Sequence, residues 1–450
     1  MHPKAKSMTR SAALTVALAL AAAHPRTAAG TTWIVGSTAD SGPSTLRNAL
    51  ANAEDGDTID FEVSGTIALT SGQLMVDKSV TIQANTETVT VDGQQASRVF
   101  HIALGKTVAI SGLTIANGRT SAQGGGIFNA GALTLRDCTL RDSWAAMGGG
   151  GVYAEGTRDA SEAVTITGCT LSGNGAGITA PYYGGGAVAL VSVDHDYLGA
   201  DVSRVDTLTV ENSLLTSNNA PSGGGIVVDV EGGTGSYYGW ENALARVTVL
   251  NSTLSDNSAE NVDGNGSGGA IAMMNFGGME GQVTLNNCTL SGNRDTAGAS
   301  GILNDGCTVD LQNTVLANAP SGANLVNGWL IGSGTVTSHG GNLSTDDGGG
   351  LLASPSDIVS TDPLLGSLQD NGGPTRTCAL LAGSPAIDAG VDTGGLPATD
   401  QRGYPRLVNG TADIGAYESG FQGCFITNNY ATGSAVVLHW TAFPDRKSVV

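Results

Sequence analysis

Aromatic and charged residues are scarce in this chain of 450 residues, at 5% and 13% of the sequence. Basic residues are also few, with 20 Lys and Arg against 40 Asp and Glu, so the formal net charge is −20. Such a charge repels phosphate backbones and anionic lipid, which excludes nucleic acid and peripheral-membrane partners. No apolar run long enough to cross a membrane occurs, so we expect no transmembrane segment.

Glycine is abundant, with 67 residues, and 40% of the sequence is hydrophobic. The hydrophobic fraction suffices for a core. Each glycine inside a helix costs about 1 kcal/mol relative to alanine, so this composition disfavours long helices. The composition therefore predicts an all-β fold that is rich in turns.

The N-terminal residues 1–29 have the pattern of a secretory signal peptide. Three basic residues precede a small-apolar run from Ala12 to Ala23, and further small residues stand before Gly30. This arrangement is typical of export signals and too short for a membrane span. We expect a secreted bacterial protein that is extracellular or bound to the cell surface.

The C-terminal end has two unusual features. Residues 445–450 match one reading frame of a common sequencing adapter, and we interpret them as an artefact. Residues 421–444 include the apolar run 435–440, which indicates the start of a further β domain that is cut short. The natural anchor of the protein is then absent from this sequence.

An eleven-residue pattern recurs along the chain in one register, at 108–118, 133–143, 164–174, 208–218, 247–257, 283–293 and 309–319. Positions one and three are aliphatic, and position eight is Leu or Ile. The positions that face the core are odd-numbered up to position three and even-numbered from position six. This change indicates two short strands joined by a bend. Position five holds Gly, Asp or Asn, the residues that enter left-handed conformations at least cost.

Two columns follow from stacking these copies. We expect the residues at position eight to form one buried column: Leu140, Leu171, Leu215, Leu254, Leu290 and Leu316. We also expect the asparagines at position five to stack as an amide ladder at the bend: Asn212, Asn251, Asn287 and Asn313.

A third strand follows each copy after a glycine cluster, and the shortest spacing between copies is 25 residues, from 108 to 133. The pattern predicts a right-handed parallel β-helix, a pectate-lyase-like solenoid over residues 62–340, whose coils bury one continuous core. Leu46, Ala49, Leu50 and Ala53 follow helical spacing. They predict a short capping helix within an N-terminal cap at 30–61, which shields the open end of the solenoid.

Several motifs carry a family resemblance. The GGxI and LxxN signatures resemble the repeats of bacterial polymorphic outer-membrane proteins, and residues 44–61 resemble the CSLREA-type entry segment of exported β-helix proteins. The motifs at 370–390, 400–406 and 413–418 closely resemble the choice-of-anchor Q domain. The resemblance implies a bacterial surface protein with a choice-of-anchor Q-like segment at 341–420.

We expect this C-terminal segment to close the far end of the solenoid. Two arginines lie in its motifs, Arg402 and Arg406. We expect them to form ion pairs with acidic residues of the same segment: Asp388, Asp400, Asp413 or Glu418.

Five of the six cysteines fall into two groups. Cys138, Cys169 and Cys288 share position six of the repeat, which favours small core residues over disulfides. Cys378 and Cys424 lie outside the repeat and are the candidate disulfide pair.

Loop insertions after the third strand give the candidate binding site. They leave the solenoid at one register, so we expect a single ridge, with its two longest loops at mid-length. Aromatic rings and carboxylates side by side suit sugar recognition, although a loop packed on itself has the same composition. The candidate ligand-binding residues are Asp194, Asp196, Tyr197, Asp201, Tyr237, Tyr238, Trp240 and Glu241.

The sequence favours an adhesin-like, monomeric protein that binds an extracellular glycan or the surface of a host or neighbouring cell. A polysaccharide lyase or hydrolase that uses the ridge carboxylates is one alternative, and a structural display stalk is another. No catalytic motif is recognisable in the sequence. The sequence identifies no cofactor and leaves open whether the protein binds calcium.

Overall fold

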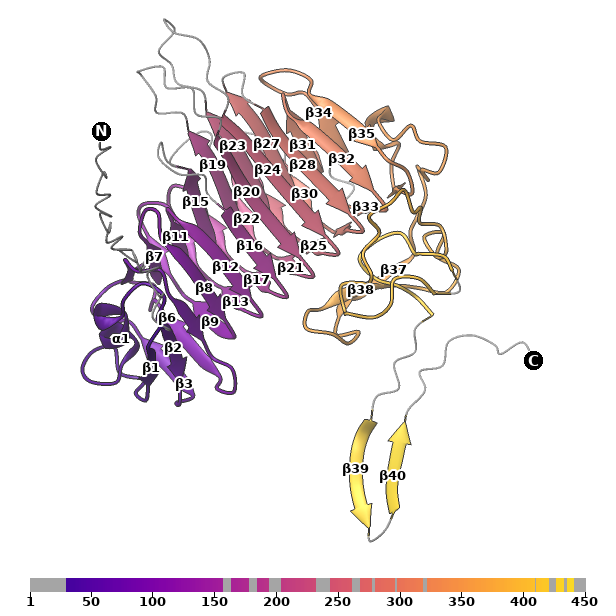
Figure 1. Ribbon diagram of the computed structural model, residues 1–450. Coiled ribbons are helices and arrows are strands. Elements are labelled where there is room, and N and C mark those ends of the chain that lie inside the picture. The colour runs from indigo at the N-terminus through magenta and orange to yellow at the C-terminus, as the bar shows by residue number, and fades with distance from the viewer. Residues whose placement is uncertain are drawn as a thin grey trace, which may run out of the picture.

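The computed structural model is an elongated right-handed parallel β-helix (Figure 1), as the repeat predicted. It describes residues 30–156, 163–177, 184–193, 204–231, 243–260, 268–276, 280–295, 298–318, 322–408 and 410–420, and the backbone of 426–432 and 435–440. One core cluster runs through the stacked coils, from Val35 in the first strand to Leu352 beyond the last coil. Within the described residues, no helix is long and apolar enough to span a membrane.

Sheet A is the longest parallel sheet. It contains β1 (Thr32–Val35), β2 (Thr58–Phe61), β5 (Thr81–Gln83), β8 (Thr107–Ser111), β12 (Ala132–Arg136), β16 (Ala163–Thr167), β20 (Arg204–Glu211), β24 (Ala243–Leu250), β28 (Glu280–Asn286), β32 (Thr308–Gln312) and β35 (Thr335–Ser338). Its strands carry positions one and three of the repeat.

Sheet B carries position eight. It contains β3 (Gly65–Ala68), β6 (Val89–Asp92), β9 (Leu113–Ala116), β13 (Thr139–Arg141), β17 (Thr170–Ser172), β21 (Leu214–Thr216), β25 (Thr253–Ser255), β29 (Thr289–Ser291), β33 (Val315–Ala317) and β36 (Leu343–Ser344).

Sheet C follows the glycine clusters. It contains β4 (Leu74–Val76), β7 (Phe100–Ile102), β11 (Ile127–Asn129), β15 (Val152–Gly156), β19 (Val188–Val193), β23 (Ile226–Glu231), β27 (Ile271–Phe276), β31 (Ala299–Asp305) and β34 (Ala323–Asn327).

The prediction of three strands per coil was incomplete, because a further sheet, sheet D, lies between sheets B and C. It contains the two-residue strands β10 (Arg119–Thr120), β14 (Trp144–Ala145), β18 (Gly175–Ala176), β22 (Asn219–Ala220), β26 (Ser258–Ala259) and β30 (Arg294–Asp295). A second left-handed corner at position ten separates sheet D from sheet B, with φ of 55° at Asp142 and 56° at Asp256.

The bend predicted at position five is confirmed. Asp137, Asn212, Asn251, Asn287 and Asn313 all have φ between 47° and 52°. Because Asn and Asp tolerate the left-handed region better than other residues with a Cβ, this corner explains their recurrence at one position.

The predicted leucine column is also confirmed. Successive position-eight leucines pair in register from coil to coil, and all are fully buried: Leu140, Leu171, Leu215, Leu254, Leu290 and Leu316.

The amide ladder forms at position eleven, so its expected place at position five was wrong. Asn174 Nδ2 donates to Asn218 Oδ1 at 3.0 Å, and Asn218 and Asn257 each donate to the next asparagine at 2.9 Å. Each amide also donates to a leucine carbonyl of the preceding coil, as Asn218 does to Leu171 at 2.9 Å. In the described chain no hydrogen bond joins two position-five asparagines, because Asn251 and Asn313 bond to the C-terminal segment instead.

The N-terminal cap has the predicted helix, α1 (Leu46–Asn52). Thr45 caps it by accepting a hydrogen bond from the Asn48 backbone N–H. The buried face of Leu46, Ala49 and Leu50 packs into the solenoid core beside β1 and β4.

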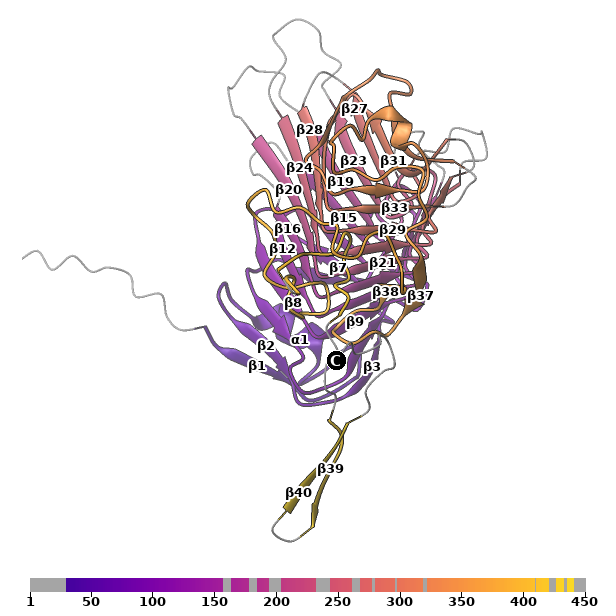
Figure 2. The ribbon, with the colours of Figure 1, turned by 90° about the vertical axis from the view of Figure 1, so that its right-hand side faces the viewer.

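The C-terminal segment does more than close the far end. It begins with β36 and the 3₁₀ turn η1 (Gly348–Gly350), and Leu351 and Leu352 then join the solenoid core. Beyond them, β37 (Leu365–Gln369) and β38 (Thr377–Leu380) form a hairpin, and loops through residue 418 pack along the side of the coils (Figure 2). The last described residues form the antiparallel pair β39 (Ile426–Thr432) and β40 (Ala435–Trp440).

We predict that Asn218→Ala lowers the free energy of unfolding by about 1–3 kcal/mol, because the ladder neighbours lose buried partners. Urea denaturation followed by circular dichroism measures the change. The adjacent, exposed Asn219 provides the control variant Asn219→Ala, which should leave the stability unchanged. Equal losses for the two variants would contradict a stabilising ladder.

Candidate functional site

The ridge residues lie outside the described part of the chain: Asp194, Asp196, Tyr197, Asp201, Tyr237, Tyr238, Trp240 and Glu241. The strands that lead into and out of the two insertions are described and adjacent. Val193 pairs with Glu231, and Arg204 pairs with Ala243. The two insertions therefore leave the solenoid from matching positions on consecutive coils.

The candidate disulfide also lies partly outside, because Cys424 is not among the described residues. Cys378 lies in β38, where burial raises the pKa of its thiol to about 11. The three repeat cysteines are buried in the solenoid core.

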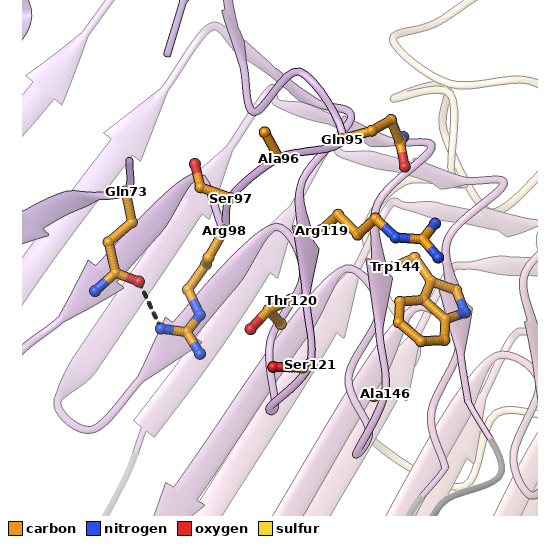
Figure 3. A pocket seen from close by; sticks show the side chains of 10 residues that line it. All are labelled: Gln73, Gln95, Ala96, Ser97, Arg98, Arg119, Thr120, Ser121, Trp144 and Ala146. Atoms are coloured by element: carbon orange, nitrogen blue, oxygen red, sulfur yellow. Dashed lines mark hydrogen bonds between the residues drawn. The ribbon is translucent and has the colours of Figure 1, made fainter. Parts of the chain in front are cut away.

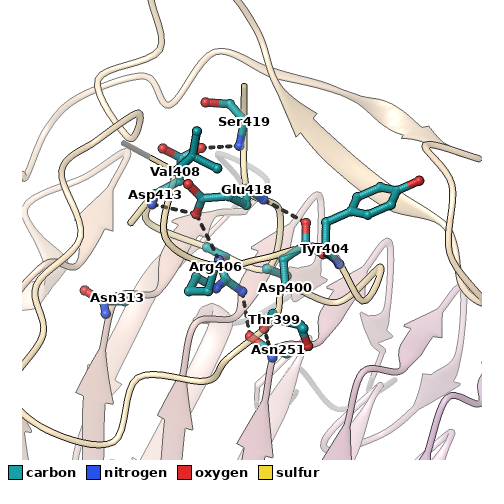
Figure 4. A network of polar contacts seen from close by, with 12 residues as sticks. Asn251, Asn313, Thr399, Asp400, Tyr404, Arg406, Val408, Asp413, Glu418 and Ser419 are labelled. Carbon is teal, nitrogen blue, oxygen red and sulfur yellow. Dashed lines mark hydrogen bonds and ion pairs between the residues drawn. The ribbon is translucent and has the colours of Figure 1, made fainter. Parts of the chain in front are cut away.

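A buried ionic network holds the C-terminal segment (Figure 4). Arg402 pairs with Asp400 at 2.6 Å, and Arg406 lies 3.8 Å from Glu418, so both arginines have acidic partners from the predicted set. Arg406 also donates to Asn251 Oδ1 at 2.6 Å and to the Gly415 carbonyl at 2.9 Å.

Two of the position-five amides, those of Asn251 and Asn313, are docking points of this segment. Asn313 donates to the Val391 carbonyl and accepts from its N–H, both at 2.8 Å, which resembles the pairing of two strands. Asn251 donates to the Thr399 carbonyl at 2.7 Å. Arg406 and Glu418 are fully buried, so the network joins two parts of the protein and offers no surface to a ligand.

We predict a pH-dependent stability that originates at Glu418. Burial raises the pKa of its carboxyl to about 8 from an ordinary value of 4.5, so the folded state binds the proton more tightly than the unfolded chain. The contribution of Glu418 to the free energy of unfolding is fully present below about pH 4.5 and is lost as the pH rises to about 8. Glu418→Gln should flatten this slope in urea titrations between about pH 5 and 8.

The control for Glu418→Gln is Glu62→Gln, since Glu62 is exposed. An unchanged slope in Glu418→Gln would show that another group causes the pH dependence.

A pocket of about 530 Å³ opens on the outer surface near the N-terminal end of the solenoid (Figure 3). Small-molecule sites commonly enclose roughly 300–1,000 Å³. Its lining comes from the turns that precede sheet C and from sheet D. The polar residues and the aromatic residue in the lining are Gln73, Gln95, Ser97, Arg98, Arg119, Thr120, Ser121 and Trp144.

Arg98 forms one wall of the pocket and is held rigidly. Its guanidinium donates to Gln73 Oε1 at 2.7 Å and to the carbonyls of Gln123 and Gly124 at 2.6 and 2.8 Å. Burial lowers the pKa of Arg98 to about 10, which still leaves it charged at neutral pH.

Arg119 and Trp144 form the other wall. They are paired residues of β10 and β14, and the guanidinium carbon lies 4.5 Å from the centroid of the Trp144 ring. Gly175 pairs with Trp144 on the next coil, where a Cβ would come within 3.2 Å of the indole. The indole is therefore packed between a glycine and a guanidinium, which orients Arg119 by a cation–π contact.

An aromatic stack lies next to this pocket on the outer face of sheet C. The rings of His101 and Phe128 are 4.9 Å apart, and those of Phe128 and Tyr153 are 5.7 Å apart and nearly parallel. Arg98 lies 5.1 Å above the Phe128 ring and joins the stack to the pocket. Burial and the charge of Arg98 lower the pKa of His101.

Part of this pocket has a signal in the sequence, just beyond the end of the eleven-residue pattern. Arg119 and Trp144 directly follow position eleven of their copies, so extending the repeat by one residue would have stacked arginine on tryptophan. Gln73 and Arg98 carry no such signal, because they lie before the first aligned copy. In the described residues, no group of three or more His, Cys, Asp or Glu side chains could hold a metal ion.

The stacked sheets and repeated left-handed corners define a right-handed parallel β-helix protein. No family model matches the chain, and no curated protein matches it significantly. A solved structure of pectate lyase Pel9A is similar at a TM-score of 0.43 and 16% identity, over 87% of this chain and 97% of that one. A structure of the PL6 family alginate lyase AlyGC is similar at a TM-score of 0.26 and 12% identity, over 90% and 60%. These likenesses concern the fold and assign no activity to this chain.

Proposed function

We propose that this protein is an exported bacterial β-helix protein that binds an extracellular glycan through the outer surface of its coils. The observation that carries the proposal is the pocket between Arg98 and Trp144. It combines fixed hydrogen-bond donors, an aromatic edge and small hydroxyl side chains. Such lining suits a polyhydroxylated ligand, because sugars need many polar partners together with apolar contact.

Two features of the sequence support this proposal. The export signal expected at 1–29 and the resemblance of 341–420 to the choice-of-anchor Q domain favour a secreted or surface-bound protein, and we propose that it acts as a monomer. The net charge of −20 disfavours nucleic acid and anionic membranes as partners. A glycan of a host or neighbouring cell is then the partner whose chemistry fits, in an adhesin-like role.

We predict that Trp144→Ala weakens binding to an immobilised polysaccharide panel by about tenfold, because Arg119 loses its support and the pocket loses its apolar wall. Biolayer interferometry measures the affinities, and thermal melting checks the fold. The control is Trp329→Ala, since Trp329 is 44% exposed and does not line the pocket. Absence of binding to every polysaccharide would contradict the proposed function and favour a display stalk.

The ridge gives a second test, which separates a binder from a polysaccharide lyase or hydrolase. In a binder, Asp194→Asn should weaken affinity only mildly, because an amide still bonds to sugar hydroxyls. In an enzyme that relies on this acid, the same change should remove turnover by orders of magnitude. Release of unsaturated products or reducing ends measures turnover, and Trp240→Ala tests whether the ridge contacts the glycan.

A further inference from the structure

We infer that the pocket between Arg98 and Trp144 recognises an anionic sugar unit, which carries a carboxylate or a sulfate, and that Arg119 makes the direct contact. This inference rests on the proposed function, since it names the class of glycan that the pocket accepts. Four observations support it: the absence of acidic partners, the free donors of Arg119, the fixed charge of Arg98 and an unpartnered hydroxyl.

The two arginines lack acidic partners in a chain that has twice as many acidic as basic residues. Among the ion pairs of the described residues, none within 4.0 Å involves Arg98 or Arg119. The neighbouring carboxylates have other partners: Asp142 pairs with Arg141 at 2.7 Å, and Asp92 accepts from Asn117 at 2.9 Å. The pocket is therefore a local positive site on an acidic protein.

Arg119 has its donors available. Its guanidinium makes no hydrogen bond with the described residues, while its face rests on the Trp144 ring. Figure 3 shows the head group beside the indole, at the opposite end of the pocket from Arg98. A planar fork of N–H groups with a fixed orientation matches the two oxygens of a carboxylate or a sulfate.

Arg98 contributes in a different way. Its donors are engaged by Gln73 and by the carbonyls of Gln123 and Gly124, so it is a positioning residue that fixes positive charge in the pocket wall. The charge of Arg98 attracts an anion, while its bonded N–H groups leave the direct contacts with that anion to Arg119. A second anionic unit of one chain would meet the field of Arg98 while the first contacts Arg119.

Ser97, next to Arg98 in the chain, also lines the pocket and carries an unsatisfied hydroxyl. Its Oγ is buried and has no hydrogen-bond partner in the described part of the structure. A buried polar atom without a partner costs free energy, and a rotation of the Ser97 side chain into the pocket would let a ligand hydroxyl or ring oxygen remove this cost. Thr120 and Ser121 provide further hydroxyls in the lining, so the pocket offers neutral donors for a sugar as well as cations for its anion.

The test compares three polymers of matched length: a polyuronate, a sulfated dextran and neutral dextran. We expect at least one anionic polymer to bind about tenfold more tightly than neutral dextran, because hydrogen bonds to charged groups are the stronger ones. The tighter anionic polymer identifies the recognised group as carboxylate or sulfate. Its affinity should fall as the salt concentration rises, since the contact is partly exposed.

Arg119→Gln should reduce the affinity for the anionic polymer by about tenfold and leave that for neutral dextran unchanged. The melting temperature should stay the same, because Arg119 is an exposed residue. Arg136→Gln is the matched control: Arg136 is an exposed arginine at the end of β12 and does not line the pocket. Arg119→Lys keeps the positive charge and removes the planar N–H fork of the guanidinium. Its affinity for a carboxylate polymer should therefore lie between that of Arg119→Gln and that of the unmodified protein.

Two outcomes would overturn the inference and are distinguishable. Equal binding of neutral and anionic polymers, with Arg119→Gln silent, would refute the anionic class while leaving glycan binding intact. Absence of binding to all three polymers and to the wider panel would refute both the inference and the proposed function.

Discussion

The register between successive coils is the constraint on which the rest of this structure depends. A left-handed corner at position five turns each coil at the same point, so residues at one position stack directly on their counterparts. Stacking places Leu254 between Leu215 and Leu290 and aligns the buried amides of the position-eleven ladder. Insertion of one residue before a corner would turn core side chains to solvent, because strand faces alternate with a period of two.

The same register also organises the outer surface. Position-five amides face outward at the corner, where they would need water if nothing covered them. For two of them the C-terminal segment takes the place of water: Asn251 and Asn313 bond to its backbone as a neighbouring strand would. Arg406 then reaches Asn251 from the segment, so one corner column connects the solenoid to a region more than 150 residues later.

Much of the core could be predicted from the sequence, because the alternation of Leu254 and its counterparts depends only on local backbone geometry. The bend at Asn251 was predictable for the same reason. The direction of its side chain was not, since it depends on a segment that is distant in sequence. The two-residue strands of sheet D were also missed, because Arg119 and Trp144 follow the aligned copies and carry no periodic apolar signal.

The position of the pocket limits the shape of its ligand. Gln73, Arg98, Arg119 and Trp144 come from four successive coils, and adjacent parallel strands lie about 4.8 Å apart, so the lining extends about 14 Å along the solenoid. A ligand that touches both ends must lie along this axis as an extended chain. The outer positions of each coil can vary without disturbing the inward leucines, because the two sets point to opposite faces. Recognition of a linear polymer can therefore be built on this scaffold without altering its core.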